Sequence, residues 1–221
     1  MKVILFGASG MVGGGVLREC LLDPSVEQVL AVGRRPLGVS HPKLREIQLA
    51  DLSELTGVEG QLLGFDAAFW CLGVSSVGMS EEEYRRVTYD LTLGVARRLA
   101  HGNPGLTFTY VSGAGTDSTE RGRAMWARVK GRTENDLLKL PFKAAFMFRP
   151  GFIRARRRDH LPSVTFRVLY TVILPFMLLA SLASPNVLTS TDRVGRAMIH
   201  VVTRGAPRPW LSNREINDLA Q

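Results

Sequence analysis

The feature that most constrains the fold of this sequence is a set of spaced glycines directly after its first apolar run. Gly7, Gly10 and Gly13 follow the β-rich residues 2–6 and open a segment with apolar residues at helical spacing. Glycine here permits a tight turn, close approach of a pyrophosphate to the backbone, and close packing of a helix on a sheet. N–H groups at the start of such a helix attract phosphates. The pattern predicts a dinucleotide-binding turn with contacts from Gly7, Ser9, Gly10, Met11, Val12 and Gly13.

The segments behind this turn alternate between apolar runs and helical patterns. Further strands are predicted at 27–32, 44–49, 66–72, 106–111 and 143–148, with a late edge strand at 210–211. Helices are predicted at about 10–22, 80–100, 121–140 and 192–202, the second opening with a capping box at Ser80–Glu83. This order predicts an α/β, doubly wound parallel-sheet Rossmann fold. We expect one domain over residues 1–221, with the nucleotide-binding core at 1–150 and a small C-terminal cap with edge elements at 151–221.

The end of the second predicted strand indicates which dinucleotide binds. NAD-binding sites carry an acidic residue there, which accepts from the ribose 2′-hydroxyl. This chain has Gly33-Arg34-Arg35 instead, and Asp23 and Glu27 lie before the strand. Arginine pairs well with a 2′-phosphate, so we expect NADP to be favoured over NAD through Arg34, Arg35 and Ser9. A solvated turn is the alternative reading of the two arginines.

The charge distribution and the cysteine and histidine content argue against nucleic acid and metal ions as partners. The net charge of +8 comes from dispersed arginine pairs without interleaved aromatic residues, so no nucleic-acid partner is expected. Cys20 and Cys71 stand far apart, and the four histidines form no ligand motif, so no metal site is expected. No secretory leader is recognised, and we expect a cytoplasmic protein that binds a small molecule.

Several stretches taken together resemble the short-chain dehydrogenase/reductases. They are the glycine turn, 33–35, Asp51-Leu52, 70–73, 129–134, 149–152 and 213–216. The glycine spacing is typical of the extended and atypical branches, and the chain is most similar to small atypical members related to the NADP-binding Tat-interacting proteins. The resemblance implies cofactor contacts from Asp51, Leu52, Leu72, Gly73, Lys130, Pro150, Gly151, Phe152 and Ile153. It also implies catalytic roles for Ser112 and Lys130.

The sequence departs from the family pattern where a proton donor is expected. The position four before Lys130 holds Trp126, where the family has a tyrosine. An indole N–H does not act as an acid near neutral pH. Gly113 stands where relatives often have a second serine, and Thr88 where many have asparagine or aspartate. Tyr84, Tyr89 and Tyr110 are candidate substitutes, but the spacing favours none of them.

Residues 168–183 form an uncharged, mostly apolar run with Pro175 in the middle. Such a run is short for a membrane span. We expect a substrate-side cap that lines an apolar pocket. The alternative is a membrane-surface anchor over 154–183, in which Arg154, 156–158 and Arg167 meet acidic lipid head groups.

Two functions follow from these observations. The first is an NADP(H)-dependent oxidoreductase or epimerase-like enzyme on a small apolar carbonyl compound. The second is a non-catalytic NADP(H)-binding sensor or scaffold. The missing tyrosine separates the two.

Overall fold

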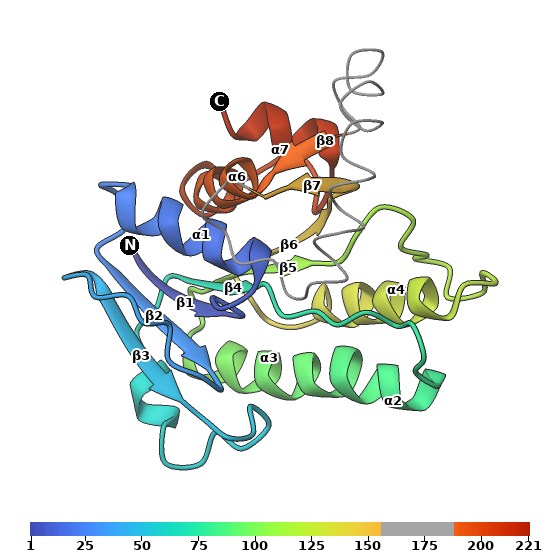
Figure 1. Cartoon of the computed structure of the whole chain (residues 1–221), viewed down its shortest axis with the longest axis horizontal. Coiled ribbons are helices and arrows are strands. Elements are labelled where there is room, and N and C mark those ends of the chain that lie inside the picture. The colour runs from blue at the N-terminus through green and yellow to red at the C-terminus, as the bar shows by residue number, and fades with distance from the viewer. Residues whose placement is uncertain (156–187) are drawn as a thin grey trace.

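The computed structural model describes residues 1–155 and 188–221, and its centre is a seven-stranded parallel sheet (Figure 1). The strand order is β3-β2-β1-β4-β5-β6-β9, and every neighbouring pair is parallel. The strands are β1 (Lys2–Phe6), β2 (Gln28–Gly33), β3 (Leu44–Gln48), β4 (Ala67–Trp70), β5 (Thr107–Val111), β6 (Ala144–Arg149) and β9 (Trp210–Ser212). The chain moves outward from β1 to β3 and then returns to β4. Ligands of such sheets bind at this reversal, outside the carboxyl ends of the strands.

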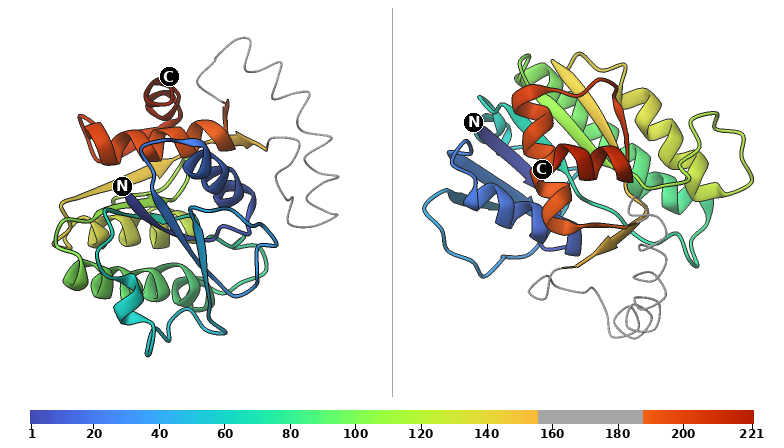
Figure 2. Two further views of the ribbon diagram at one scale, coloured as in Figure 1. Left: turned by 90° about the vertical axis from the view of Figure 1, so that its left-hand side faces the viewer. Right: turned by 90° about the horizontal axis from the view of Figure 1, so that it is seen from above.

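Helices cover both faces of the sheet (Figures 1 and 2). One face carries α1 (Met11–Leu22), α6 (Thr191–Arg204) and α7 (Asn213–Leu219). The other carries α2 (Glu81–Arg85), the π-helical turn η2 (Arg86–Asp90), α3 (Leu91–Gly102) and α4 (Met125–Leu137). A short 3-10 turn, η1 (Glu59–Leu62), precedes β4. The expectation of a doubly wound parallel sheet is confirmed.

The core consists of two layers that share the strands. Along β1, Val3 and Leu5 pack toward α1 and α6, whereas Ile4 and Phe6 pack toward α3. All four side chains are fully buried. A strand that is covered on both faces reads as a continuous apolar run, which is why residues 3–6 carry no polar alternation.

Helices α1 and α6 pack closely because glycine lies at their crossing. A Cβ atom on Gly15 would come within 2.3 Å of the Thr191 Cβ, and one on Gly195 within 3.1 Å of the Val16 Cα. Real Cβ atoms essentially never come within 3 Å of another heavy atom in this way, so Gly15 is required by this packing. Helix α1 is therefore held by the C-terminal part of the chain.

A second sheet joins β7 (Phe152–Arg154) and β8 (Leu188–Ser190) in parallel. Neither strand was expected from the sequence, and α7 was not expected either. The predicted cap at 168–183 lies outside the described residues, as does most of the proposed anchor segment. The predicted edge strand at 210–211 is confirmed as β9.

Two helix predictions were wrong in detail. The helix expected at 121–140 begins at Met125, and the helix expected at 80–100 is interrupted by the π-helical turn at 86–90. The capping box at its start is confirmed, with Ser80 and Glu83 each bonding the other's backbone N–H.

Candidate nucleotide and substrate site

The glycine turn forms an open cradle between β1 and α1. Gly7 has φ +82°, and a Cβ there would lie 2.8 Å from the Cys71 backbone. A Cβ on Gly13 would lie 2.1 Å from the Gly7 carbonyl oxygen, so both glycines are required by the turn itself. Gly10 is exposed, and its N–H donates to the Gly7 carbonyl at 2.9 Å. Among the described residues no side chain caps α1 at Gly10, which leaves its first N–H groups for a ligand.

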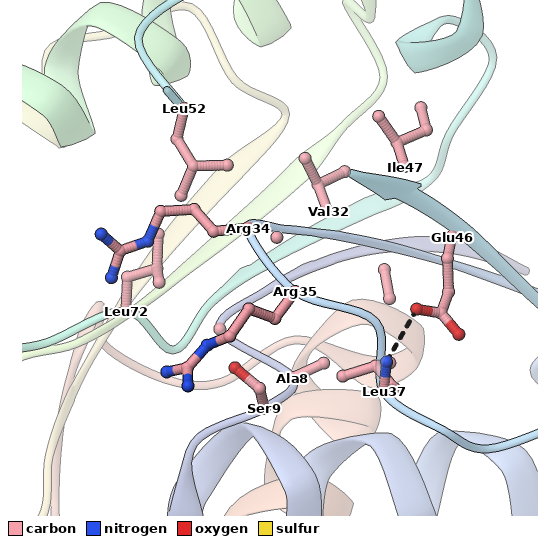
Figure 3. Close-up of a pocket in the computed structure, with 13 residues that line it drawn as sticks. Ala8, Ser9, Val32, Arg34, Arg35, Leu37, Glu46, Ile47, Leu52 and Leu72 are labelled. Atoms are coloured by element: carbon pink, nitrogen blue, oxygen red, sulfur yellow. Dashed lines mark hydrogen bonds between the residues drawn. The ribbon is translucent and has the colours of Figure 1, made fainter. Parts of the chain in front are cut away.

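A pocket opens beside this turn at the carboxyl ends of β1, β2 and β3, and we call it the β1–β3 pocket (Figure 3). It is lined by Gly7, Ala8, Ser9, Ala31, Val32, Gly33, Arg34, Arg35, Leu37, Glu46, Ile47, Leu52 and Leu72. The Arg34 side chain extends toward Leu52 and Leu72, and the Arg35 side chain toward Ser9. Both guanidinium groups are exposed and free to meet an anion.

Glu46 on β3 also lines this pocket, although sequence reasoning missed it. Its Oε2 accepts a hydrogen bond from the Leu37 backbone N–H at 3.0 Å (Figure 3). The carboxylate thereby holds the loop that follows Arg34 and Arg35. The position of Glu46 depends on the pairing of β3 with β2, which brings Glu46 opposite Ala31. Only that strand register could have predicted its place in the pocket.

Several predicted contacts lie outside the residues that line the pocket. The Asp51 carboxylate accepts from the backbone N–H and the hydroxyl of Ser53, both at 2.8 Å, and these bonds hold its pKa below the usual range. Gly73 is exposed directly after Leu72. Met11, Val12 and Gly13 form the first turn of α1. Nucleotide contacts of all these residues stay predictions.

A second group of predicted residues meets at the carboxyl ends of β5 and β6, and we call it the β5–β6 end. Lys130 Nζ donates to the Ser112 carbonyl oxygen, and the Ala114 N–H donates to the Pro150 carbonyl at 2.7 Å. The Ser112 hydroxyl donates to the Phe148 carbonyl at 3.1 Å, so it must rotate before it can donate to a substrate. Gly151, Phe152 and Ile153 continue from Pro150 into β7.

Burial lowers the pKa of Lys130 to about 8, and the nearby Glu134 opposes this shift. Glu134 is fully buried and forms a two-pronged ion pair with Arg149, whose Nε lies 3.1 Å from both carboxylate oxygens. The Glu134 carboxylate therefore accepts from the Arg149 guanidinium. The lowered pKa of Lys130 makes its proton easier to remove than that of a solvent-exposed lysine.

Trp126 lies one turn before Lys130 on α4, and its ring packs beside Gly115. A Cβ on Gly115 would lie 3.3 Å from the indole Cη2. Gly113 has φ +150°, within the range that favours glycine, which gives a backbone reason for the absence of a second serine.

Comparison with known proteins agrees with this geometry. No family model matches the chain. It is 28% identical to rat HTATIP2 over 163 residues, covering 73% of this chain and 66% of that protein, slightly under two thirds. It is 23% identical to the mitochondrial FMP52 protein of Candida albicans, covering 72% and 70% of the two chains.

Solved structures show the same fold. Bordetella bronchiseptica WbmF, in complex with NAD+, matches with a TM-score of 0.64 at 18% identity, over 99% of this chain and 76% of WbmF. A UDP-N-acetylglucosamine 4-epimerase from Methanobrevibacter ruminantium matches with a TM-score of 0.66 at 13% identity, over 95% and 74%. The chain is similar to the atypical short-chain dehydrogenase/reductases and shares their fold.

Within the described part of the chain, each tyrosine is either buried or hydrogen-bonded to a carboxylate. Tyr84 and Tyr110 are buried, and burial raises the pKa of both hydroxyls. The Tyr89 hydroxyl donates to Asp136 Oδ2 at 2.6 Å. The fourth tyrosine, Tyr170, lies outside the described residues.

The loop between β5 and α4 of the dehydrogenase-like fold is built on Asp117. Its carboxylate accepts from the N–H groups of Thr119, Arg121 and Gly122 and from the Thr119 hydroxyl, and these bonds lower its pKa to about 2. A Cβ on Gly131 would lie 1.8 Å from the Asp117 carbonyl oxygen, so the loop sits directly on α4. Asp117 is thus a structural acceptor, and Glu120 within this loop has a non-helical φ of 62°, so the helix expected from 121 begins only after the loop, at Met125.

The described residues hold no cluster of three metal-ligating side chains. No helix within residues 1–155 and 188–221 is both long and apolar enough to cross a membrane.

Proposed function

We propose that the chain binds NADP(H) along the carboxyl edge of its sheet and acts as an oxidoreductase or epimerase-like enzyme on a small apolar carbonyl compound. One observation carries the proposal. The uncapped glycine turn and the two arginines after β2 open into the same pocket, with no acidic residue at the end of β2. Glycine backbone and helix N-terminus suit a pyrophosphate, and exposed arginines suit a 2′-phosphate.

Each part of the site has a role in this proposal. Gly10 and the first turn of α1 hold the pyrophosphate, and Arg34 and Arg35 with Ser9 hold the 2′-phosphate. Leu52 and Leu72 flank the adenine. Bound in this way, a nicotinamide dinucleotide supplies or accepts a hydride. WbmF is described in complex with NAD+, which supports a dinucleotide in the same place of the fold.

The β5–β6 end supplies the remaining roles. Lys130 holds the nicotinamide ribose with its ammonium group, and Ser112 binds the substrate oxygen after its hydroxyl leaves the Phe148 carbonyl. Pro150 and the residues up to Ile153 flank the nicotinamide.

A non-catalytic NADP(H)-binding sensor or scaffold is the second candidate, and Trp126 favours it. The indole occupies the place of the phenol and supplies no acid. Nucleotide binding does not depend on that phenol. In this second candidate function, the β1–β3 pocket still binds the nucleotide, but no reaction is catalysed.

Cellular context belongs to the same proposal. We infer a cytoplasmic protein with a small-molecule partner and no nucleic acid, and a peripheral membrane contact through 154–183 as the alternative surface role. The fungal relatives are named mitochondrial, so a mitochondrial location is the competing assignment.

Titration of NADPH and NADH by fluorescence tests the proposed cofactor. We expect NADPH to bind at least about tenfold more tightly, because a charge-assisted pair with a phosphate contributes on the order of 1.4 kcal/mol or more. Arg34→Ala and Arg35→Ala should reduce this preference and leave NADH binding nearly unchanged. Arg204→Ala, at the exposed end of α6, is the matched control. Equal affinities in the wild type, or an unchanged preference in both pocket variants, would contradict the assignment.

A further inference from the structure

Helix α7 carries two asparagines one turn apart, and both reach the small β7–β8 sheet. The Asn213 Oδ1 accepts from the Gly151 N–H at 2.9 Å, and the Asn217 Nδ2 donates to the Leu188 carbonyl at 3.0 Å. Residues at i and i+4 share one face of a helix. One short helix thus holds the residue before β7 and the first residue of β8.

The hydrogen bond from the Gly151 N–H to Asn213 lies directly beyond the last backbone pair of strands β6 and β9. Strands β6 and β9 pair in parallel up to Arg149 and Ser212, where the ladder ends. Asn213 follows Ser212, and its side chain bonds the N–H of Gly151 just beyond the ladder. Asn213 is buried, so water does not readily replace this acceptor.

Helix α7 is itself firmly placed. The Ser212 N–H and hydroxyl donate to Glu215 Oε2 at 2.8 and 2.6 Å, and Arg208 pairs with the other carboxylate oxygen at 2.5 Å. Ile216 is fully buried against the core. The asparagine side chains therefore extend from a fixed base.

Gly151 is also tied to the β5–β6 end through its neighbour. Pro150 accepts from the Ala114 N–H, two residues after Ser112, whose carbonyl binds Lys130. A dinucleotide with its adenosine in the β1–β3 pocket and its pyrophosphate on the glycine turn must extend across β4 to reach this end. The Pro150–Ile153 segment then lies beside the nicotinamide half.

We propose that Asn213 is a positioning residue for the nicotinamide half of the dinucleotide, acting through the Gly151 N–H to fix the Pro150–Ile153 segment. Asn217 fixes the start of β8 in the same way. This inference rests on the proposed function, because it requires that a dinucleotide binds. The proposed role of Asn213 affects only the nicotinamide half of the ligand, whereas a general effect on folding would weaken the binding of both halves.

The test compares NADPH with 2′,5′-ADP, which carries the adenosine half and the 2′-phosphate but no nicotinamide. Asn213→Leu should weaken NADPH binding by about tenfold and leave 2′,5′-ADP within about twofold, since a lost buried hydrogen bond typically changes an equilibrium by this order. Asn213→Asp retains an acceptor oxygen and should keep NADPH within about threefold of the wild type. Hydrogen exchange at the Gly151 amide should become faster in the leucine variant only. Arg214→Ala, an exposed neighbour on α7, is the control.

The outcomes are separable. Equal weakening of both ligands by Asn213→Leu, or unchanged NADPH binding, would overturn the positioning role. Failure of Asn213→Asp to restore NADPH binding in a folded variant would overturn it too. A wild-type chain that binds neither ligand would overturn the proposed function, and the positioning role with it.

Discussion

The β1–β3 pocket and the β5–β6 end lie on the same edge of one sheet, but they differ in completeness. The pocket has an uncapped helix start, a glycine cradle and two exposed arginines. The β5–β6 end has a partly buried lysine and a serine whose hydroxyl already donates to a carbonyl, with Trp126 where a tyrosine was expected. Among the described residues, the groups that are proposed to bind the nucleotide are therefore all present, whereas the groups that are proposed to react are incomplete. Affinity and reactivity in this chain should respond to different substitutions.

The largest effect is expected at the glycine cradle. Gly10→Val should abolish binding of NADPH and of 2′,5′-ADP, by more than about a hundredfold, because a branched side chain fills the space for the pyrophosphate. Gly14→Ala is the matched control, since its Cβ would lie at an ordinary 3.5 Å from the Ala8 carbonyl oxygen. Calorimetric titration together with circular dichroism measures both. Normal nucleotide binding by a folded valine variant would show that the turn is only structural.

The next effect concerns reactivity at the β5–β6 end. Trp126→Tyr should raise NADPH-dependent reduction of small ketones and quinones by about a hundredfold over a low wild-type rate, because a positioned general acid contributes on that order. Nucleotide affinity should change little. Trp126→Phe opens similar space without a hydroxyl and should give no gain. Robust wild-type turnover that the tyrosine leaves unaltered would place the acid elsewhere.

A smaller effect of pH on nucleotide affinity should distinguish the β5–β6 end from the β1–β3 pocket. The ammonium of Lys130 loses its proton near pH 8, so NADPH affinity should fall about fivefold from pH 7 to pH 9 as the contact to the nicotinamide ribose weakens. Binding of 2′,5′-ADP should stay constant over that range. A parallel fall for both ligands would show that Lys130 is not the group responsible.

Lys130 should also make the free energy of unfolding depend on pH. Burial lowers its pKa in the folded state, so between about pH 8 and 10.5 the unfolded chain binds one more proton. Its contribution to the free energy of unfolding therefore rises with pH across this window. Lys130→Met should flatten the rise, which is on the order of 3 kcal/mol at most, in urea titrations at pH 8 and pH 10.

The smallest effect is expected at Glu46. Its negative charge lies in the pocket that is proposed to hold a 2′-phosphate, so Glu46→Gln should tighten NADPH binding about two- to threefold and leave NADH unchanged. Glutamine retains an oxygen for the Leu37 N–H. The difference should vanish in high salt, where exposed charges are screened. Weaker binding of both nucleotides would instead show that Glu46 acts through the loop.

The sequence predicted features that are formed by contiguous residues and missed features that depend on contacts between distant residues. The cradle and the arginines were predictable because each is set by contiguous residues between one strand and its helix. Glu46 was not, since its place depends on the register of β3 beside β2. The bonds from three N–H groups to the Asp117 carboxylate depend on a loop conformation that no periodicity encodes. The link from Asn213 to Gly151 joins residues too far apart in sequence for any motif to show it.

The glycine-mediated crossing of α1 and α6 has a consequence for how the chain is made. Gly15 lies on α1 and its partner Thr191 on α6, so α1 is synthesised well before the helix that packs against it. At about 5–20 residues per second, the apolar face of α1 waits roughly ten seconds or longer for α6. Val16, fully buried in the native state, lacks its α6 neighbour Gly195 during that interval. The helix that is proposed to receive phosphate therefore has an incompletely covered apolar face until α6 is made.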